Sequence, residues 1–143
     1  MSTGKPREVV EQFFHDLDHM YDDPPTNPLS TFHEDIVFTV TGQTPMSKTH
    51  HGLKTIIEQH AAAEEKLFIP PKTYRAYPIE WFEEDDKVAL ITRVRLETMH
   101  GLPYNGVYFF FFKIKDGKLI RIVENVEESL AWQTSFDVHL EPE

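Results

Sequence analysis

Apolar residues in the first half of the chain recur with the period of an α-helix. In residues 6–22 they form one stripe, which predicts an amphipathic helix that begins at Pro6 and ends before the proline-rich run after residue 22. A second stripe, opened by Gly52, predicts another helix. The stripe residues are Val9, Val10, Phe13, Phe14, Leu17, Met20 and Tyr21 in the first helix and Leu53, Ile56, Ile57, His60, Ala61 and Glu64 in the second.

Elsewhere the pattern changes to the two-residue alternation of β-strands. Residues 36–42 alternate and are rich in β-branched side chains; a short helical turn is expected before them, at 29–35, and a loop after them, at 43–51. Four longer strands are expected at 72–84, 87–99, 103–115 and 118–129. The turn "DD" joins the first two strands, and the turn "KDG" joins the last two. This order of elements predicts a single α+β domain over residues 1–143, with a mostly antiparallel sheet.

The stretch "NGVYFFFFKIKDGK" (residues 105–118) predicts a strand that is apolar on both faces. If Lys113 and Lys115 face solvent, the same face of the strand carries an outer triad of Val107, Phe109 and Phe111. The other face carries Tyr108, Phe110, Phe112 and Ile114. Strands that are apolar on both faces are usually buried on both. Because the helices can cover only one face, we expect a second copy of the chain to cover the outer triad in a homodimer.

Composition and charge narrow the classes of function. The chain has 143 residues, of which 40% are hydrophobic, and a formal net charge of -10, which argues against nucleic acid or an anionic membrane as partner. No apolar run is long enough to span a membrane, and "MSTGKPREVV" lacks a signal-peptide core, so a cytoplasmic location is expected. The sequence has no cysteine, zinc-binding histidine motif or Gly-rich phosphate loop, so neither a metal nor a cofactor is expected.

Three segments carry a resemblance to a known superfamily. They are the helix "VVEQFFHDLDHMY", the strand, loop and helix start "FHEDIVFTVTGQTPMSKTHHGLKTII", and the last hairpin "DGKLIRIVENVEES". Over its whole length the chain resembles the nuclear transport factor 2-like superfamily, and within it the SnoaL-like and ketosteroid isomerase-like proteins. The resemblance implies a cone, in which a strongly curved sheet wraps around the N-terminal helix, with a ligand pocket in its mouth and dimers formed through the outer sheet face. It does not imply one function, because this fold supports both enzymes and binding proteins.

The resemblance also shows which ketosteroid isomerase residues this chain lacks. Those enzymes use an aspartate base, with a tyrosine and a protonated aspartate as oxyanion donors. Carried onto this sequence, the base falls near Thr39, the tyrosine at Phe13 and the protonated aspartate at Phe110. None of these side chains can do the required acid–base chemistry, so steroid isomerisation by that mechanism is not expected.

Glu124 is the first of two candidate catalytic residues. It interrupts an alternation whose other members point inward if Arg121 points outward, namely Ile120, Ile122 and Val126. Burial there raises the pKa of a carboxyl group toward the range of a general base. The alternatives are a strand end that has reached solvent and an ion pair with an arginine such as Arg93.

His60 is the second candidate, and five apolar residues are candidates for a ligand-binding wall. His60 lies on an apolar stripe, either as a proton acceptor above the pocket or as a core histidine bonded to a backbone carbonyl. The candidate wall residues are Phe13, Phe38, Trp81, Tyr108 and Phe110. Tyr108 either presents its hydroxyl group to a ligand or bonds to the backbone, and Trp81 either lines the mouth of the cone or caps the core.

Two hypotheses of function follow from these residues. In the first, the protein is a SnoaL-like binding protein whose apolar pocket holds a small hydrophobic molecule. In the second, it is a cofactor-independent isomerase, cyclase or dehydratase that acts on a carbonyl or polyketide-like substrate, with Glu124 as general base.

Overall fold

The computed structural model describes residues 5–63, 74–98 and 100–126. The helical elements are α1 (Pro6–His19), the 3-10 turn η1 (Pro28–Thr31), and α2 (Leu53–Thr55), which continues directly into the π-helical segment η2 (Ile56–Ala61). The strands are β1 (Phe32–Val40), β2 (Thr49–His51), β3 (Arg75–Glu84), β4 (Lys87–Glu97), β5 (Pro103–Lys115) and β6 (Lys118–Asn125). In these ranges no helix is long and apolar enough to cross a membrane.

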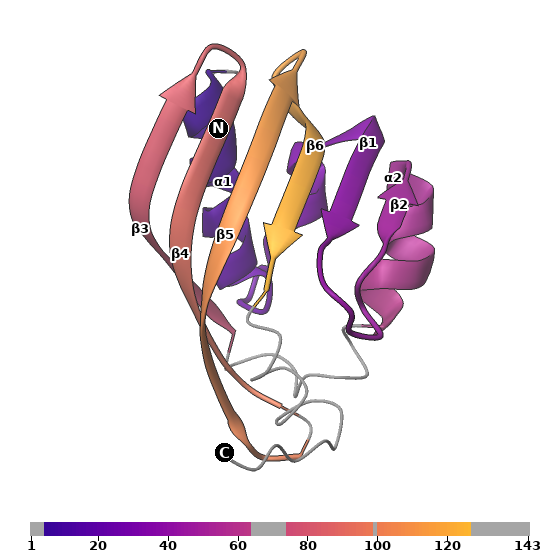
Figure 1. The fold of residues 1–143 in the computed structure, drawn as a ribbon, viewed down its shortest axis with the longest axis vertical. Helices are drawn as coiled ribbons and strands as arrows, with labels where there is room; N and C mark the ends of the chain where they lie inside the picture. The colour runs from indigo at the N-terminus through magenta and orange to yellow at the C-terminus, as the bar shows by residue number, and fades with distance from the viewer. Residues whose placement is uncertain (1–4, 64–73, 99, 127–143) are drawn as a thin grey trace.

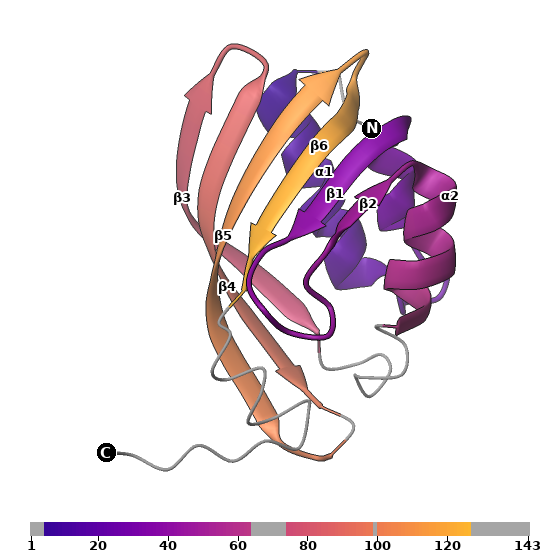
Figure 2. The same ribbon diagram turned by 45° about the vertical axis from the view of Figure 1, so that its right-hand side comes forward.

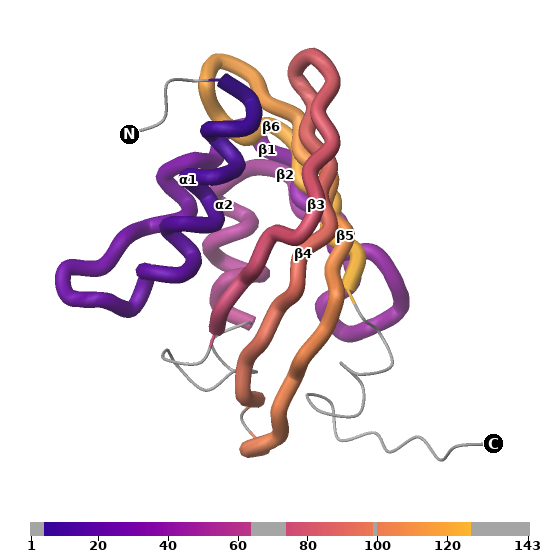
Figure 3. The backbone as a smooth tube through the Cα atoms, turned by 90° about the vertical axis from the view of Figure 1, so that its left-hand side faces the viewer, coloured from indigo at the N-terminus to yellow at the C-terminus, as the bar shows by residue number. Residues whose placement is uncertain are grey.

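The described strands form one mixed sheet in the order β2-β1-β6-β5-β4-β3. β1 and β6 run parallel, and the other neighbouring pairs in this sheet run antiparallel. Figures 1 and 2 show α1 and α2 on the same side of the sheet, and Figure 3 shows the long strands curving beneath them. The predicted α+β cone, with a curved sheet wrapped around the N-terminal helix, is therefore confirmed.

The apolar stripe of α1 forms the core against the sheet, as its period predicts. Val9 and Val10 are fully buried. Phe14 packs edge-on against Phe110 of β5, with ring centroids 5.5 Å apart, and Phe13 packs in the same way against Phe112 at 5.9 Å. Because each phenylalanine buries about 150–250 Å² of mostly apolar surface, this aromatic layer accounts for several kcal/mol of stability.

β5 has the predicted bounds, and β6 begins at the predicted residue, Lys118. The turn that joins them places Asp116 at φ 53° and Gly117 at φ 70°. Two successive residues with positive φ are the mark of the tight hairpin turns that Asp-Gly favours. Asp85 also has a positive φ, 52°, in the turn between β3 and β4. The predicted strands at 72–84, 87–99 and 118–129 extend at one end into residues outside the described ranges.

The first part of the sheet differs from the prediction in two ways. β1 begins at Phe32, inside the expected helical turn, because η1 ends at Thr31. The expected loop at 43–51 contains the short strand β2, which pairs antiparallel with β1. Three residues are too few for an alternation to be recognised in the sequence, so this strand is identified only through its partner.

Three apolar residues predicted to face the core do not, and the first is Tyr21, which is 46% exposed beyond the end of α1 at His19. Ile57 is 47% exposed because the π-helical turns of η2 are wider than α-helical turns, so its place on the predicted stripe is wrong. In β6 the pairing with β5 shifts between Lys113 and Ile114. As a result Leu119 is fully buried and Ile120 only half-buried, while Ile122 keeps its inward position.

Candidate functional site

The concave face of the sheet, the side that faces α1, places Glu124 among apolar side chains. Pairing across the strands aligns one row, which we call the Glu124 row: Val40, Glu124, Phe110, Leu90 and Trp81. Val40, Phe110 and Leu90 are buried, and Glu124 is half-buried. The predicted inward direction of Glu124 thus agrees with the strand pairing. The alternative of an ion pair between Glu124 and Arg93 is wrong, because Arg93 is exposed and lies opposite Val107 on the other face of the sheet.

Two tyrosines lie next to this row on the same face. Tyr104 and Tyr108 are both buried, with ring centroids 6.0 Å apart in an edge-on arrangement, and Tyr108 lies 5.9 Å from Phe110. Burial raises the pKa of the Tyr108 hydroxyl group well above its usual range, and Tyr104 and Glu124 raise it further. The hydroxyl group of Tyr108 therefore stays protonated at neutral pH and can act as a hydrogen-bond donor.

Thr92, which pairs with Tyr108 across β4 and β5, is one of the polar groups that the sequence reasoning missed. Its side chain is 0% exposed, and its Oγ1 has no hydrogen-bond partner among the described residues. Most buried hydroxyl groups in proteins are bonded, and one that is not costs about 1–3 kcal/mol. The alternation of β4 indicates the inward direction of Thr92, but only the folded structure shows that its hydroxyl group is isolated.

A pair of buried histidines lies where β1, β2 and η2 meet. The ring centroid of His60 is 4.6 Å from that of Phe38 and 5.6 Å from that of His50. His50 was missed because it fell in the predicted loop; in β2 it points inward while His51 points outward. Burial lowers the pKa of His50, and the nearby His60 and Lys48 lower it further, against a hydrogen bond with Gln59 that raises it.

The other predicted wall residues occupy different environments. Phe13 and Phe38 are almost fully buried in the core, and Phe13 is surrounded by Phe14, Phe32 and Phe112. Trp81 lies at the far end of the Glu124 row, where the guanidinium group of Arg7 covers its ring at 4.6 Å from the centroid. A role in ligand binding stays a prediction for all five residues.

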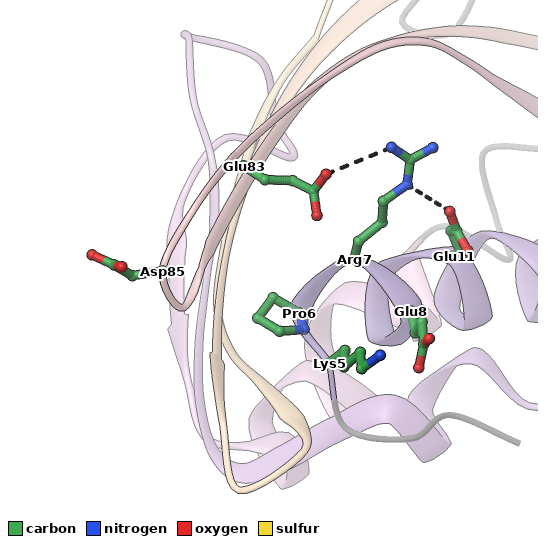
Figure 4. A pocket seen from close by; sticks show the side chains of 7 residues that line it. All are labelled: Lys5, Pro6, Arg7, Glu8, Glu11, Glu83 and Asp85. Carbon is green, nitrogen blue, oxygen red and sulfur yellow. Dashed lines mark hydrogen bonds and ion pairs between the residues drawn. The ribbon is translucent and has the colours of Figure 1, made fainter.

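An open groove lies at the first turn of α1, beside the end of β3 (Figure 4). It is lined by Lys5, Pro6, Arg7, Glu8, Glu11, Glu83 and Asp85. Arg7 forms ion pairs with Glu11 at 2.7 Å and with Glu83 at 3.6 Å. None of the predicted wall residues lines this groove, and its central cation already has acidic partners.

The positions that correspond to the ketosteroid isomerase residues do not form an acid–base site. Thr39 points to the convex side, where its Oγ1 lies 2.9 Å from that of Thr49, and its inward neighbours Phe38 and Val40 are apolar. Phe13 and Phe110 belong to the aromatic core described above. Within the described ranges, no group of three or more His, Asp or Glu side chains is placed to hold a metal ion.

Comparison of the sequence with known families gives no match: neither a protein-family model nor a curated protein matches the chain. Comparison of the structure is informative. The chain is similar to an NTF2-like protein of unknown function from Burkholderia pseudomallei, with a TM-score of 0.76 and 14% identity over 94% of this chain and 98% of that one. It is also similar to an NTF2-like protein from Burkholderia xenovorans, with a TM-score of 0.69 and 19% identity over 94% and 98% of the two chains.

A third similar structure is that of TerC co-crystallised with polyporic acid. Its TM-score is 0.72, with 19% identity over 93% of this chain and 98% of TerC. All three matches span nearly the whole of both chains, and their low identities make them evidence of fold alone. The curved sheet, its strand order and these matches together show that the chain has the nuclear transport factor 2-like fold.

Proposed function

We propose that the concave face of the sheet binds a small, mainly apolar molecule that carries one polar group. The observation that carries this proposal is the buried hydroxyl group of Thr92, which lacks a partner among the described residues and lies beside Tyr108. A polar atom of a ligand at this place would remove the cost of leaving the hydroxyl group unbonded. The aromatic side chains on the same face supply the apolar surface that small-molecule sites require.

The comparison with TerC supports this use of the fold. TerC was co-crystallised with polyporic acid. The rings of Tyr104, Tyr108 and Phe110 give this chain an aromatic surface on its concave face.

Native mass spectrometry of the purified protein tests the proposal first, because a retained molecule appears as added mass. Thermal stabilisation by a panel of small aromatic and alicyclic alcohols, ketones and amines tests it second, since a ligand at 100 times its Kd stabilises by about 2.7 kcal/mol. We expect Thr92→Val to weaken binding of the best ligand, while the same change on the convex side, Thr39→Val, leaves it unchanged. A protein that retains no molecule and responds to no member of the panel would refute the proposal.

The second candidate function is a cofactor-independent isomerase, cyclase or dehydratase. It is favoured by the proximity of a carboxylate and a protonated phenol, since the charge of Glu124 contributes to the raised pKa of Tyr108. Glu124 would remove a proton from the carbon next to a carbonyl group, and Tyr108 would donate a hydrogen bond to the enolate oxygen that forms. With any substrate that is turned over, Glu124→Gln should abolish activity, while Glu80→Gln, an exposed change of the same charge, should not.

We also propose that the convex face of the sheet forms a symmetric homodimer. The outer triad lies on the same face of the sheet as Tyr77 and Phe82 of β3, and these two residues together with Val107 and Phe109 are between 40% and 55% exposed. Apolar side chains that gather on one exposed face are typical of protein–protein interaction sites. A two-fold axis would let the same patch serve both subunits.

A further inference from the structure

The end of α1 places two histidine side chains next to each other on the surface of the molecule. His15 and His19 are four residues apart on the helix, and their ring centroids are 4.5 Å apart. Their side chains are 58% and 48% exposed, so both rings are open to solvent. Both lie outside the core and outside the candidate site described above.

An aspartate holds each of these rings through its Nδ1 atom. Nδ1 of His15 lies 3.2 Å from a carboxylate oxygen of Asp16, and Nδ1 of His19 lies 2.6 Å from one of Asp22. Because an ionised carboxylate can only accept a hydrogen bond, Nδ1 donates in both pairs. The lone pair of each neutral ring is then on Nε2, and neither Nε2 atom has a hydrogen-bond partner among the described residues.

The fold also fixes the two carboxylates. Asp16 is buried and accepts a second hydrogen bond, from Nε2 of Gln12 at 2.8 Å. Asp22 lies in the turn after α1, where its backbone N–H group and that of Thr26 donate to the carbonyl oxygen of His19. Histidines that bind metal ions usually donate their other ring N–H group to a carboxylate in this way, which orients the ring and increases its basicity.

The distance between the rings fits two neighbouring ligands of one metal ion. With metal–nitrogen bonds of about 2.0–2.1 Å, an ion bound by Nε2 lies about 3.2 Å from the ring centroid. Two such rings at 90° have centroids about 4.5 Å apart, whereas the tetrahedral angle separates them by about 5.2 Å. The observed 4.5 Å therefore favours ions whose ligands stand at 90°, such as Ni²⁺ and Cu²⁺, both of which imidazole suits.

We infer that His15 and His19 form a surface site for one Ni²⁺ or Cu²⁺ ion, bound through both Nε2 atoms, with Asp16 and Asp22 as positioning residues. In the described ranges no third His, Asp or Glu side chain completes a metal site, so water molecules fill the other positions. The negative C-terminal end of α1 and the formal net charge of -10 favour a cation here. The sequence alone predicts no metal site, and the inference departs from that expectation because the structure adds a carboxylate behind each ring. It does not depend on the proposed ligand site of the concave face.

Titration of the full chain with Ni²⁺, followed by calorimetry in a non-coordinating buffer at pH 7.5, tests the two ligands. We expect His15→Gln and His19→Gln each to weaken the tightest site on the order of tenfold or more, because each removes one ligand. His51→Gln, the same change at an exposed histidine of β2, should leave the affinity unchanged. An affinity that survives either of the first two changes would overturn the inference.

Asp22→Asn tests the positioning role. It keeps both imidazoles and removes the carboxylate bonded to Nδ1 of His19, so the affinity for Ni²⁺ should fall by about tenfold. Asp23→Asn, at the exposed neighbouring residue, alters the net charge equally and should have no such effect. Equal affinities in these two variants would overturn the role of Asp22. Circular dichroism and thermal melting show that each variant remains folded.

NMR spectroscopy identifies the ligands directly, because substoichiometric Cu²⁺ broadens the ring signals of the histidines that bind it. We expect the signals of His15 and His19 to broaden first and together, while those of the exposed His51 persist. Broadening that begins at another histidine, or none at all, would overturn the inference.

Discussion

The two faces of β5 have nearly the same chemistry and different surroundings. On the concave face, Tyr104, Tyr108, Phe110 and Phe112 are buried, and α1 covers the last two of them. On the convex face, Phe109 is 53% exposed and Val107 40% exposed. Aromatic side chains on one face of a strand thus predict that this face is buried. They do not predict which segment or partner buries it.

The faces also differ in the polar groups that lie between the aromatic rings. The concave face holds Thr92 and Glu124 within its aromatic layer, whereas the charged residues of the convex face, such as Arg93 and Lys113, are exposed to solvent. Polar groups are costly to bury and add specificity when a partner bonds them. Our proposal places ligand binding on the concave face and association on the convex face because of this difference, and four experiments test it.

The largest difference between the faces should appear in stability. Phe112→Ala removes a fully buried ring that contacts Phe13 and Phe14, so we expect it to lower the free energy of unfolding by about 3–5 kcal/mol. Phe109→Ala should cost far less, because that ring is largely exposed in the single chain. Urea denaturation measures both values at a protein concentration where the two variants are monomeric. Equal losses would contradict the difference in burial.

The second experiment concerns association. Phe109→Glu combined with Phe111→Glu places two charges within the convex patch and should convert a dimer to a monomer. Light scattering coupled to size-exclusion chromatography measures the mass. Lys113→Glu, at the edge of the same face, is the matched control and should leave the dimer intact. A wild-type protein that stays monomeric at high micromolar concentration would contradict the proposed dimer.

A smaller effect is expected from Thr92 in the ligand-free protein. Thr92→Val removes an unbonded hydroxyl group and keeps the shape of the side chain, so it should raise the free energy of unfolding by about 1 kcal/mol. Thr39→Val, whose hydroxyl group is bonded to Thr49 on the convex side, should not stabilise the protein. Denaturation of both variants shows whether each change raises or lowers the free energy of unfolding. A loss of stability in Thr92→Val would show that the hydroxyl group is bonded in solution.

The smallest expected effect is the pH dependence contributed by His50. Its pKa is lowered in the folded protein, so the unfolded chain binds the proton first as the pH falls below about 6.5. Stability from this group is therefore complete above pH 6.5 and declines below it, by at most about 1.4 kcal/mol per pH unit. His50→Asn should flatten this decline in unfolding curves measured between pH 7.5 and pH 5, whereas His51→Asn, on the exposed side of β2, should not.

Local patterns were sufficient to predict most of the fold. The bounds of β5, its Asp-Gly turn and the inward direction of Glu124 all follow from alternation over many residues. What failed depended on how the strands pair: β2 is defined by its partner β1, and the burial of Leu119 by a shift in register with β5. The position of Ile57 depends on a change of helix type that no residue pattern in the second helix announces.

The inward direction of Glu124, His60 and Tyr108 could be predicted, because each of them interrupts or joins an apolar pattern, while a role in a site stays a prediction. The contacts among side chains of the candidate site could not be predicted. The isolation of the Thr92 hydroxyl group and the contact between His60 and His50 are properties of the packed structure, since they depend on side chains from different strands and helices.

The parallel pairing of β1 with β6 bears on the order in which the molecule folds. β6 is the last described strand in the sequence and yet lies in the middle of the sheet, and its hydrogen bond from Asn125 to Thr41 spans 84 residues. Closing so long a loop is slow, and until β6 docks, β1 and β2 have no connection to β3, β4 and β5 within the described sheet. Glu124, carried on that strand, therefore reaches its place only in the step that joins the two parts. On a ribosome, this step must wait until β6 has been made.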